Sequence, residues 1–146
     1  MALEPVWRAG FIMVGESVVT THTDEMRPEA ARIPRLWRRF FSLRGGASKG
    51  VPTAIFDRYE SDHRGAFRVT LADDTPESGT PVVVPDGLYV QFVAEGRRPA
   101  AVARTWQEIW DLTEAGGLRR AFTADYELHV SPTRAEIYVA VVASSR

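Results

Sequence analysis

The sequence predicts an α+β fold made of two tandem β-α-β-β modules, with two helices on one face of an antiparallel sheet. The order strand, helix, strand, strand can be read twice along the chain. Each predicted helix carries an aromatic cluster, LWRRFF in the first and WQEIW in the second. The third element of each module carries a Tyr-Glu pair, Tyr59-Glu60 and Tyr126-Glu127. An internal duplication explains these coincidences better than chance.

The length of 146 residues fits one domain that buries about two-thirds of its unfolded surface. We expect a single domain over residues 1–146, with halves at about 10–75 and 86–143 that are joined by a Pro/Gly-rich linker at about 76–85. Two such halves side by side share a groove, and a ligand would lie naturally in a cleft of this kind.

The composition excludes several classes of function. Hydrophobic residues make up 45% of the chain and charged residues 25%, which is ordinary for a globular protein. A net charge of −1 provides no electrostatic footprint for nucleic acid. Because there is no cysteine, disulfides, thiolate metal ligands and a cysteine nucleophile are excluded. No apolar run approaches the ~20 residues of a membrane helix and the start lacks a signal-peptide pattern, so we expect a cytoplasmic protein.

The first half begins with a β-branched segment, Phe11–Thr21, that predicts one strand. Pro28 suits the first turn of a helix, and an apolar stripe at helical spacing follows it. Pro34 lies inside this segment, so the helix either kinks or begins there. Two strands are expected next, over residues 53–61 and 66–74.

The loop between that helix and the next strand is rich in glycine but does not match a phosphate-binding loop. In GGASKG, Lys49 is followed by Gly50 rather than by Ser or Thr, and no strand leads directly into the loop. We therefore expect no phosphate site here.

The second half repeats the pattern. A strand over 88–95 precedes a helix over 97–117, in which Gly116 and Gly117 are typical of a C-terminal cap. Two strands over 121–130 and 135–143 close the chain.

Glu127 is the candidate polar floor of an aromatic pocket. On a strand it faces away from Tyr126 and Leu128. A carboxylate in an apolar setting favours either a cationic partner or a proton, because desolvation disfavours its charge. The alternative is that Glu127 is solvated or is paired with one of three nearby basic residues: Arg119, Arg120 or His129.

Aromatic residues supply candidate walls for this pocket. Trp106 and Trp110 are four apart and therefore share one helix face, and Trp37 is their counterpart in the first half. Such residues can be core or can attract a cation through their ring faces. Weaker candidates are Tyr89, Phe92, Tyr59, Phe56 and Tyr138. Because side chains alternate along a strand, Tyr89 and Phe92 face opposite ways and not all of these residues can line one cavity.

Other charged and metal-ligating residues are less informative. Glu60 lies among Arg58, Asp62 and Arg64, so we expect it to be exposed. The three histidines show no metal-ligand spacing, and no metal or cofactor is expected.

Taken together, the motifs resemble a known family. LW..F in the first helix, YVQF before the second, W..IW within it, and DYE.H followed by EIYV at the end are similar, from about Phe11 to Val142, to the gyrase-inhibitor-like family. This family is also called the AraC-type or bacterial transcription-activator effector-binding domain. The resemblance implies a duplicated βαββ module with a hydrophobic cleft for bulky, often cationic, aromatic compounds. It places the buried glutamate of the family on Glu127 and its helix tryptophan on Trp106 or Trp110. His129 stands where the family usually has an aromatic residue.

The resemblance favours a stand-alone binding module for hydrophobic cations, which acts in drug sequestration or in transcription regulation through a protein partner. No catalytic residue is assigned, and no nucleic acid or membrane partner is expected; the chain is expected to be a monomer or homodimer. One alternative is a small-molecule hydrolase with Glu127 as base and Tyr138 or Tyr89 as acid. Another is a protein inhibitor of a macromolecular target such as DNA gyrase.

Overall fold

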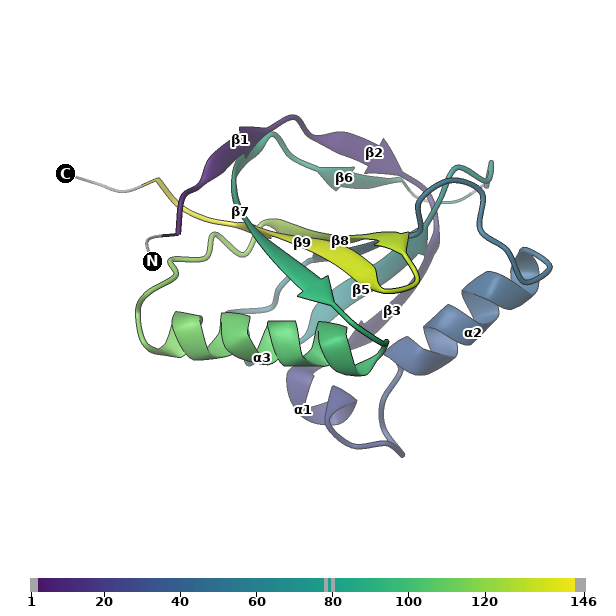
Figure 1. The fold of residues 1–146 in the computed structure, drawn as a ribbon, viewed down its shortest axis with the longest axis horizontal. Coiled ribbons are helices and arrows are strands. Elements are labelled where there is room, and N and C mark those ends of the chain that lie inside the picture. Colours follow the sequence, from purple (N-terminus) through teal and green to yellow (C-terminus); the bar gives the residue numbers. More distant parts are fainter. Residues whose placement is uncertain (1–2, 78, 80, 144–146) are drawn as a thin grey trace.

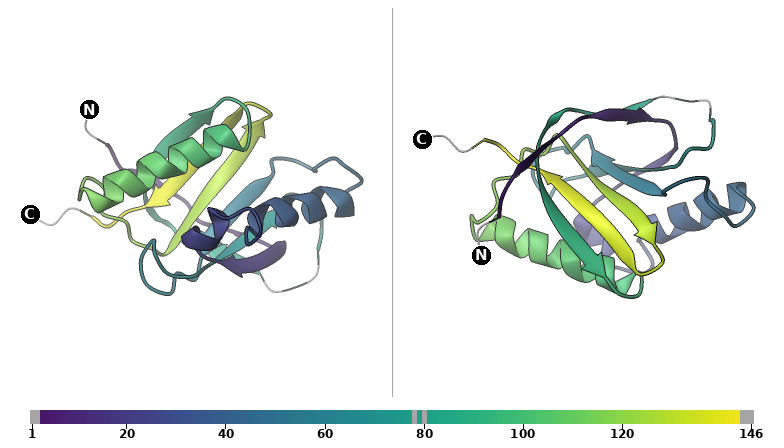
Figure 2. Two further views of the ribbon diagram at one scale, coloured as in Figure 1. Left: turned by 90° about the horizontal axis from the view of Figure 1, so that it is seen from below. Right: turned by 45° about the horizontal axis from the view of Figure 1, so that its top comes forward.

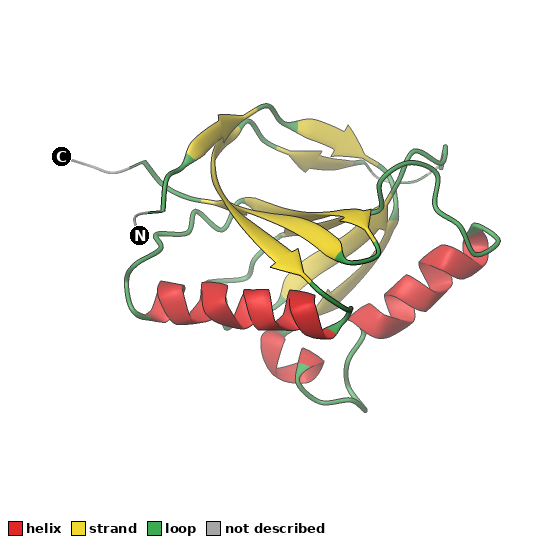
Figure 3. Cartoon of the chain, in the orientation of Figure 1, coloured by secondary structure: helices red, strands yellow, loops and turns green. Residues whose placement is uncertain are grey.

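The computed structural model describes residues 3–77, 79 and 81–143. These residues form nine strands and three helices (Figure 1, Figure 3). The strands are β1 (Val6–Arg8), β2 (Phe11–Met13), β3 (Glu16–Thr20), β4 (Thr53–Asp57), β5 (Phe67–Ala72), β6 (Val82–Val84), β7 (Gly87–Glu95), β8 (Ala124–Ser131) and β9 (Arg134–Ala140). The helices are α1 (His22–Glu25), α2 (Ile33–Leu43) and α3 (Ala100–Glu114).

Seven strands form one antiparallel sheet in the order β1-β7-β9-β8-β4-β5-β3. The second half of the chain supplies the neighbours β7, β9 and β8, and the first half supplies β4, β5 and β3. They meet where β8 pairs with β4, with Glu127 opposite Ala54. The predicted α+β class with an antiparallel sheet is therefore confirmed, whereas the duplication of an ancestral half stays a prediction.

The helices cover one face of the sheet, as the view from below shows (Figure 2). Helix α2 packs on β3 and β5, and α3 packs on β7. Their apolar stripes bury Leu36 and Phe40 from α2 and Ile109 from α3 against the sheet, where Ile137 is fully buried. This layer is the main core and forms the side of the molecule that carries the cavity described below.

A ribbon of two strands, β2 and β6, lies over the opposite face (Figure 1). Beneath it is a second core that contains Tyr89, Tyr126 and Tyr138. The sequence does not predict this ribbon. β6 lies inside the expected linker at 76–85, of which residues 78 and 80 lie outside the described residues, and β1 lies in the expected lead-in.

The predicted strand Phe11–Thr21 is two strands, β2 and β3, in different sheets. The chain crosses between them at Gly15, where an added Cβ would lie 2.0 Å from the Leu71 carbonyl oxygen. Only a residue without a side chain allows the backbone to pass this close.

The first long helix begins at Ile33, so of the two alternatives that the sequence left open, a kink at Pro34 or a start there, the structure has the start. Pro34 lies in the first turn, where its missing N–H is not needed. Glu25 from α1 accepts hydrogen bonds from the backbone N–H groups of Arg32, at 2.8 Å, and Ile33, at 3.1 Å. This carboxylate satisfies the free donors that open the helix, which fixes where α2 begins.

The two Tyr-Glu pairs do not occupy matching positions. Tyr126 and Glu127 lie within β8, whereas β4 ends at Asp57, before Tyr59 and Glu60. Arg58 has a left-handed backbone conformation with φ of 50°, which turns the chain out of the strand. Glu60 is exposed.

Candidate functional site

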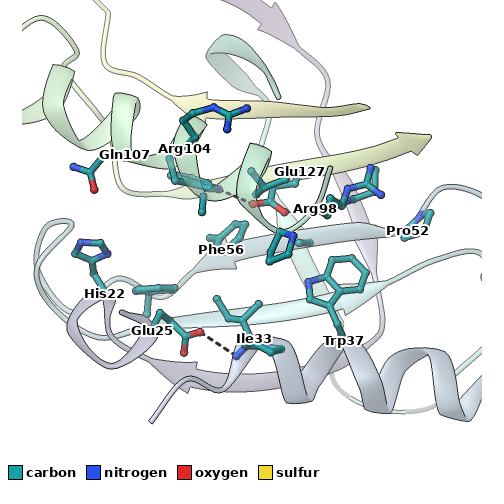
Figure 4. A pocket seen from close by; sticks show the side chains of 18 of the residues that line it. His22, Glu25, Ile33, Trp37, Pro52, Phe56, Arg98, Arg104, Gln107 and Glu127 are labelled. Carbon is teal, nitrogen blue, oxygen red and sulfur yellow. Dashed lines mark hydrogen bonds and ion pairs between the residues drawn. The ribbon is translucent and has the colours of Figure 1, made fainter. Parts of the chain in front are cut away.

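A cavity of about 1170 Å³ lies between the helices and the sheet. Figure 4 shows residues of its wall, which come from both halves of the chain. The first half supplies His22, Glu25, Ile33, Trp37 and Phe56, among others, and the second half supplies Arg98, Trp106, Trp110, Glu127 and His129, among others. The volume is slightly larger than the roughly 300–1,000 Å³ of ordinary small-molecule sites, so a bulky ligand fits.

Glu127 lies on the helix-facing side of β8 and is 4% exposed. Its Oε2 accepts a hydrogen bond from Trp106 Nε1 at 2.5 Å, and its Oε1 contacts His129 Nε2 at 2.7 Å. An ionised carboxylate only accepts hydrogen bonds, so Nε2 of His129 carries the proton in this contact. The sequence left the partner of Glu127 open, and the structure assigns His129 rather than Arg119 or Arg120.

Trp106 and Trp110 share one face of α3, as their spacing predicts. Their ring centroids are 6.3 Å apart, and the Trp106 ring packs edge-on against Phe56 from β4, at 5.2 Å. Trp106 is buried, whereas Trp110 is half-buried and contacts the ring of His22. Both tryptophans therefore belong to the core and to the cavity wall at once.

Trp37 lines the cavity near Glu127 from the other long helix, α2. It projects from α2 toward the cavity (Figure 4). Its ring meets the His129 ring in an edge geometry, with centroids 4.8 Å apart. His129 is fixed further by its backbone N–H, which donates to the Pro52 carbonyl at 3.0 Å. Aromatic rings from both helices thus flank the buried carboxylate.

A second polar cluster lies at the wall formed by Tyr59 and Arg120. Asp125 is fully buried and accepts hydrogen bonds from the Tyr59 hydroxyl and from Arg120 Nη2, the latter at 2.8 Å. Its other oxygen accepts the backbone N–H of Ala140 at 2.8 Å. Burial and the neighbouring Asp125 carboxylate raise the pKa of Tyr59 well above its usual range. The hydroxyl of Tyr59 therefore stays protonated at neutral pH and donates its hydrogen bond to Asp125.

Two further basic residues, Arg98 and His22, line the cavity wall. Arg98 donates to the carbonyl oxygens of Ser131 and Arg134, and burial lowers the pKa of its guanidinium while the charge of Glu127 acts in the opposite direction. Burial, and to a lesser extent His63, lower the pKa of His22. His22 is therefore neutral at neutral pH.

Six of the residues predicted for the site line this cavity: Glu127, Trp106, Trp110, Trp37, His129 and Tyr59. Three do not, which corrects the expectation for Tyr89, Tyr138 and Phe92. Tyr138 lies opposite Tyr126 and shares the second core with Tyr89, beneath the ribbon. Phe92 faces the helices but is buried in the main core.

These positions also exclude the acid-base pairs that the hydrolase hypothesis names. Glu127 faces the helices, whereas Tyr89 and Tyr138 lie on the other side of the sheet. A carboxylate and a hydroxyl on opposite faces cannot act on one substrate.

Sequence reasoning missed the wall residues that come from short or irregular segments. His22 lies in the four-residue helix α1, and Arg98 and Arg120 lie in connections next to α3 and β8. Such segments have no periodicity from which an inward-facing side could be read.

Among the described residues, no group of three or more His, Asp or Glu side chains is placed to hold a metal ion. Of the helices in this part of the chain, none has the length and apolar content to span a bilayer.

Comparison with known proteins places this geometry in a family. Residues 6–141 match the model of the Cass2 family, described as integron-associated effector binding protein. The crystal structure of an integron cassette protein from the mobile metagenome of Vibrio cholerae has a TM-score of 0.85 and 34% identity, over 97% of this chain and 96% of that chain.

Two other solved structures share the fold at lower identity. SAV2435 bound to tetraphenylphosphonium has a TM-score of 0.70 and 16% identity, over 98% of this chain and 95% of that chain. A Staphylococcus aureus MU50 protein, provisionally named a bacterial transcription regulation protein, has a TM-score of 0.69 and 15% identity, over 98% of this chain and 99% of that chain. At these identities the likeness shows the fold alone. None of the curated proteins is significantly similar to the chain.

Proposed function

The chain belongs to the Cass2 family of integron-associated effector binding proteins, and we propose that its cavity binds a hydrophobic aromatic cation with Glu127 as the ionic partner. The observation that carries the proposal is a buried carboxylate at the wall of an apolar cavity. Within the described part of the chain, no Lys or Arg forms an ion pair with it.

The energetics favour a cation at this position. A buried, ionised carboxylate is costly unless a positive charge and hydrogen bonds offset its desolvation. Trp106 supplies a hydrogen bond to Glu127 but no charge. A ligand cation near the carboxylate would provide the missing charge, and the faces of Trp rings would add roughly 0.5–2 kcal/mol each.

Two of the three arginines of the wall, Arg98 and Arg120, have partners other than Glu127. Arg120 is paired with Asp125, and Arg98 is hydrogen-bonded to two backbone carbonyl groups. Neither forms an ion pair with Glu127, although the charge of Glu127 acts on Arg98 from a distance, so the carboxylate keeps room for a ligand cation in direct contact.

The comparisons support this proposal without testing it. The family is one of effector-binding proteins, and SAV2435, which shares the fold, is bound to tetraphenylphosphonium, a bulky aromatic cation. We also propose that this family is related to the gyrase-inhibitor-like family, and that the protein acts in the cytoplasm by sequestration or through a regulatory partner.

Titration with tetraphenylphosphonium tests the proposal. Because Trp106, Trp110 and Trp37 line the cavity, binding should quench tryptophan fluorescence at micromolar concentrations. Glu127→Gln should weaken binding more than tenfold, since the amide keeps the shape of the side chain but loses its charge and one of its two acceptor oxygens.

Glu60→Gln is the matched control, because this exposed glutamate also follows a tyrosine in sequence. It should bind as tightly as the unmodified protein. Equal affinity of the Glu127→Gln variant and the unmodified protein would refute the cation site.

A further inference from the structure

His129 and Glu127 form a buried pair at the cavity wall. The atoms Nε2 and Oε1 are 2.7 Å apart, and the two side chains are 7% and 5% exposed. The residues are two apart on β8, so their side chains leave the same face of the strand. Since Nε2 already carries a proton toward the carboxylate, a second proton can add only at Nδ1. The pair then has a charge of −1 when His129 is neutral and no net charge when His129 is protonated.

We infer that His129 determines the charge class of the ligand that this cavity accepts. When His129 is neutral, the pair has an uncompensated negative charge that a monocation can neutralise. When His129 is protonated, its imidazolium takes that position, and a cation would enter beside a pair that is already neutral. A ligand cation and a proton on His129 therefore compete, while an uncharged aromatic ligand is insensitive to this competition. The inference rests on the proposed function and specifies the charge that the ligand must carry at a given pH.

The groups that pack on His129 leave Glu127 as its electrostatic partner. Trp37 from α2 contacts the ring, and the Pro52 carbonyl, just before β4, holds the backbone. Arg98, which precedes α3, is the nearby cation, and its charge interacts with that of Glu127. Within the described residues, the only ion pair or side-chain hydrogen bond of His129 is the one to Glu127.

Two other charged groups of the cavity, Glu25 and Arg120, have partners of their own. Glu25 in α1 accepts two backbone N–H groups of α2 and the hydroxyl of Thr20. Arg120 is paired with Asp125. Arg104 lines the cavity from α3.

His22 and His63 are the other histidines of the wall. Burial and the neighbouring His63 lower the pKa of His22, so His22 takes up a proton only at lower pH than an ordinary histidine. His63 contacts Glu114, on the exposed side of α3, at 2.6 Å. Neither residue contacts Glu127, so they serve as controls for His129.

The test is the dissociation constant of tetraphenylphosphonium between pH 5.5 and 8.5, measured by tryptophan fluorescence. This cation has no titratable group, so any pH dependence belongs to the protein. We expect its affinity to fall at least fivefold from pH 8.5 to 5.5, with a slope of up to about tenfold per pH unit. The uncharged probe triphenylphosphine oxide should change by less than twofold. His129→Gln should remove the pH dependence, and His22→Gln and His63→Gln should retain it.

Calorimetry on the unmodified protein makes the test independent of whether His129→Gln folds. In two buffers of different ionisation enthalpy near pH 6.5, cation binding should release a measurable fraction of one proton. Two results on the unmodified protein would overturn the role of His129: an affinity that does not depend on pH, or the absence of proton release. The same holds if the pH dependence persists in His129→Gln, or if it disappears in His22→Gln or His63→Gln. Each of these results would leave the proposed function standing. Failure of the cation to bind at any pH would overturn both.

Discussion

Glu127 accepts two hydrogen bonds and still has capacity for a ligand. An ionised carboxylate offers about four acceptor positions, and Trp106 and His129 use one on each oxygen. The indole donor is neutral, so it orients the carboxylate without cancelling its charge. The anion is therefore held in a fixed direction before any ligand arrives, which lowers the cost of binding.

Trp106→Phe should show how much this orientation matters. The substitution keeps most of the ring but removes the Nε1 donor, which leaves Oε2 of a buried carboxylate without that partner. We expect a loss of about 1–3 kcal/mol in the free energy of unfolding and weaker tetraphenylphosphonium binding, measured by urea denaturation and by calorimetric titration.

Trp110→Phe is the matched control, because Trp110 lies on the same helix face without a hydrogen bond to Glu127. Equal losses in the two variants would show that ring size, and not the hydrogen bond, is what the site requires.

At the scale of single residues, the sequence could predict which side chains face the helices but not which atoms meet. Alternation along β8 correctly separated Glu127 from Tyr126. It could not reveal that Tyr138 lies opposite Tyr126, because this depends on strand register. Nor could it reveal that Arg120, in the irregular connection before β8, pairs with Asp125. Register is a property of the folded sheet and has no signal within one strand.

Among the elements, α2 depends on a residue that is remote from its own sequence pattern. The apolar stripe that includes Leu36 and Phe40 was readable from the sequence. Its beginning was not, because Glu25, which accepts hydrogen bonds from Arg32 and Ile33, lies in a separate short helix. This contact connects α1 to α2 and so positions Trp37 at the cavity.

Glu25→Ala should therefore affect both stability and binding. Loss of a carboxylate that caps a helix N-terminus costs about 0.5–2 kcal/mol, and α2 should fray at its first turn. We expect the midpoint of urea denaturation to fall and hydrogen exchange of the amides of Arg32 and Ile33 to accelerate.

Glu29→Ala provides the comparison, since Glu29 is an exposed acidic residue of the same segment whose ion pair is with Arg27. Its stability should stay within about 0.5 kcal/mol of the unmodified protein. The capping role of Glu25 would be contradicted if the two variants exchanged these amides at the same rate.

The strands of the ribbon, β2 and β6, could not be predicted from the sequence. Each strand has three residues, which is too short to show an alternation. The break at Gly15 is enforced by the Leu71 carbonyl, from a strand that is distant in the sequence.

At the scale of the whole molecule, the repeated order of elements was predictable because local periodicity and turn residues encode it. The cavity was predictable only as a groove between halves, since its wall combines Trp37 and Phe56 from one half with Trp106 and Glu127 from the other. The second core was not predicted, because it needs the ribbon to cover the far face of the sheet.

The three tyrosines of the second core, together with Tyr59 at the cavity wall, make the stability of the molecule sensitive to alkali. All four tyrosines have raised pKa values, with burial as the first cause, and the pKa of Tyr89 rises to about 12. In the unfolded chain each tyrosine titrates near pH 10. Stability is therefore fully present below about pH 10 and is lost as the pH rises toward the folded-state values, because the unfolded chain gives up its protons first.

We expect the free energy of unfolding to fall between pH 10 and 11 by up to about 1.4 kcal/mol for each buried tyrosine. Urea denaturation at pH 8, 10 and 11 measures this, with tyrosinate absorbance at 295 nm as a direct readout. The chain has one lysine and no cysteine, so tyrosines are the main groups that titrate in this range.

Tyr89→Phe should make the decline shallower, because the variant lacks one of the four groups. A free energy of unfolding that stays constant from pH 9 to 11 would contradict this prediction. It would mean that the tyrosine hydroxyls ionise as readily in the folded protein as in water, although Tyr89 and Tyr126 are buried beneath the ribbon.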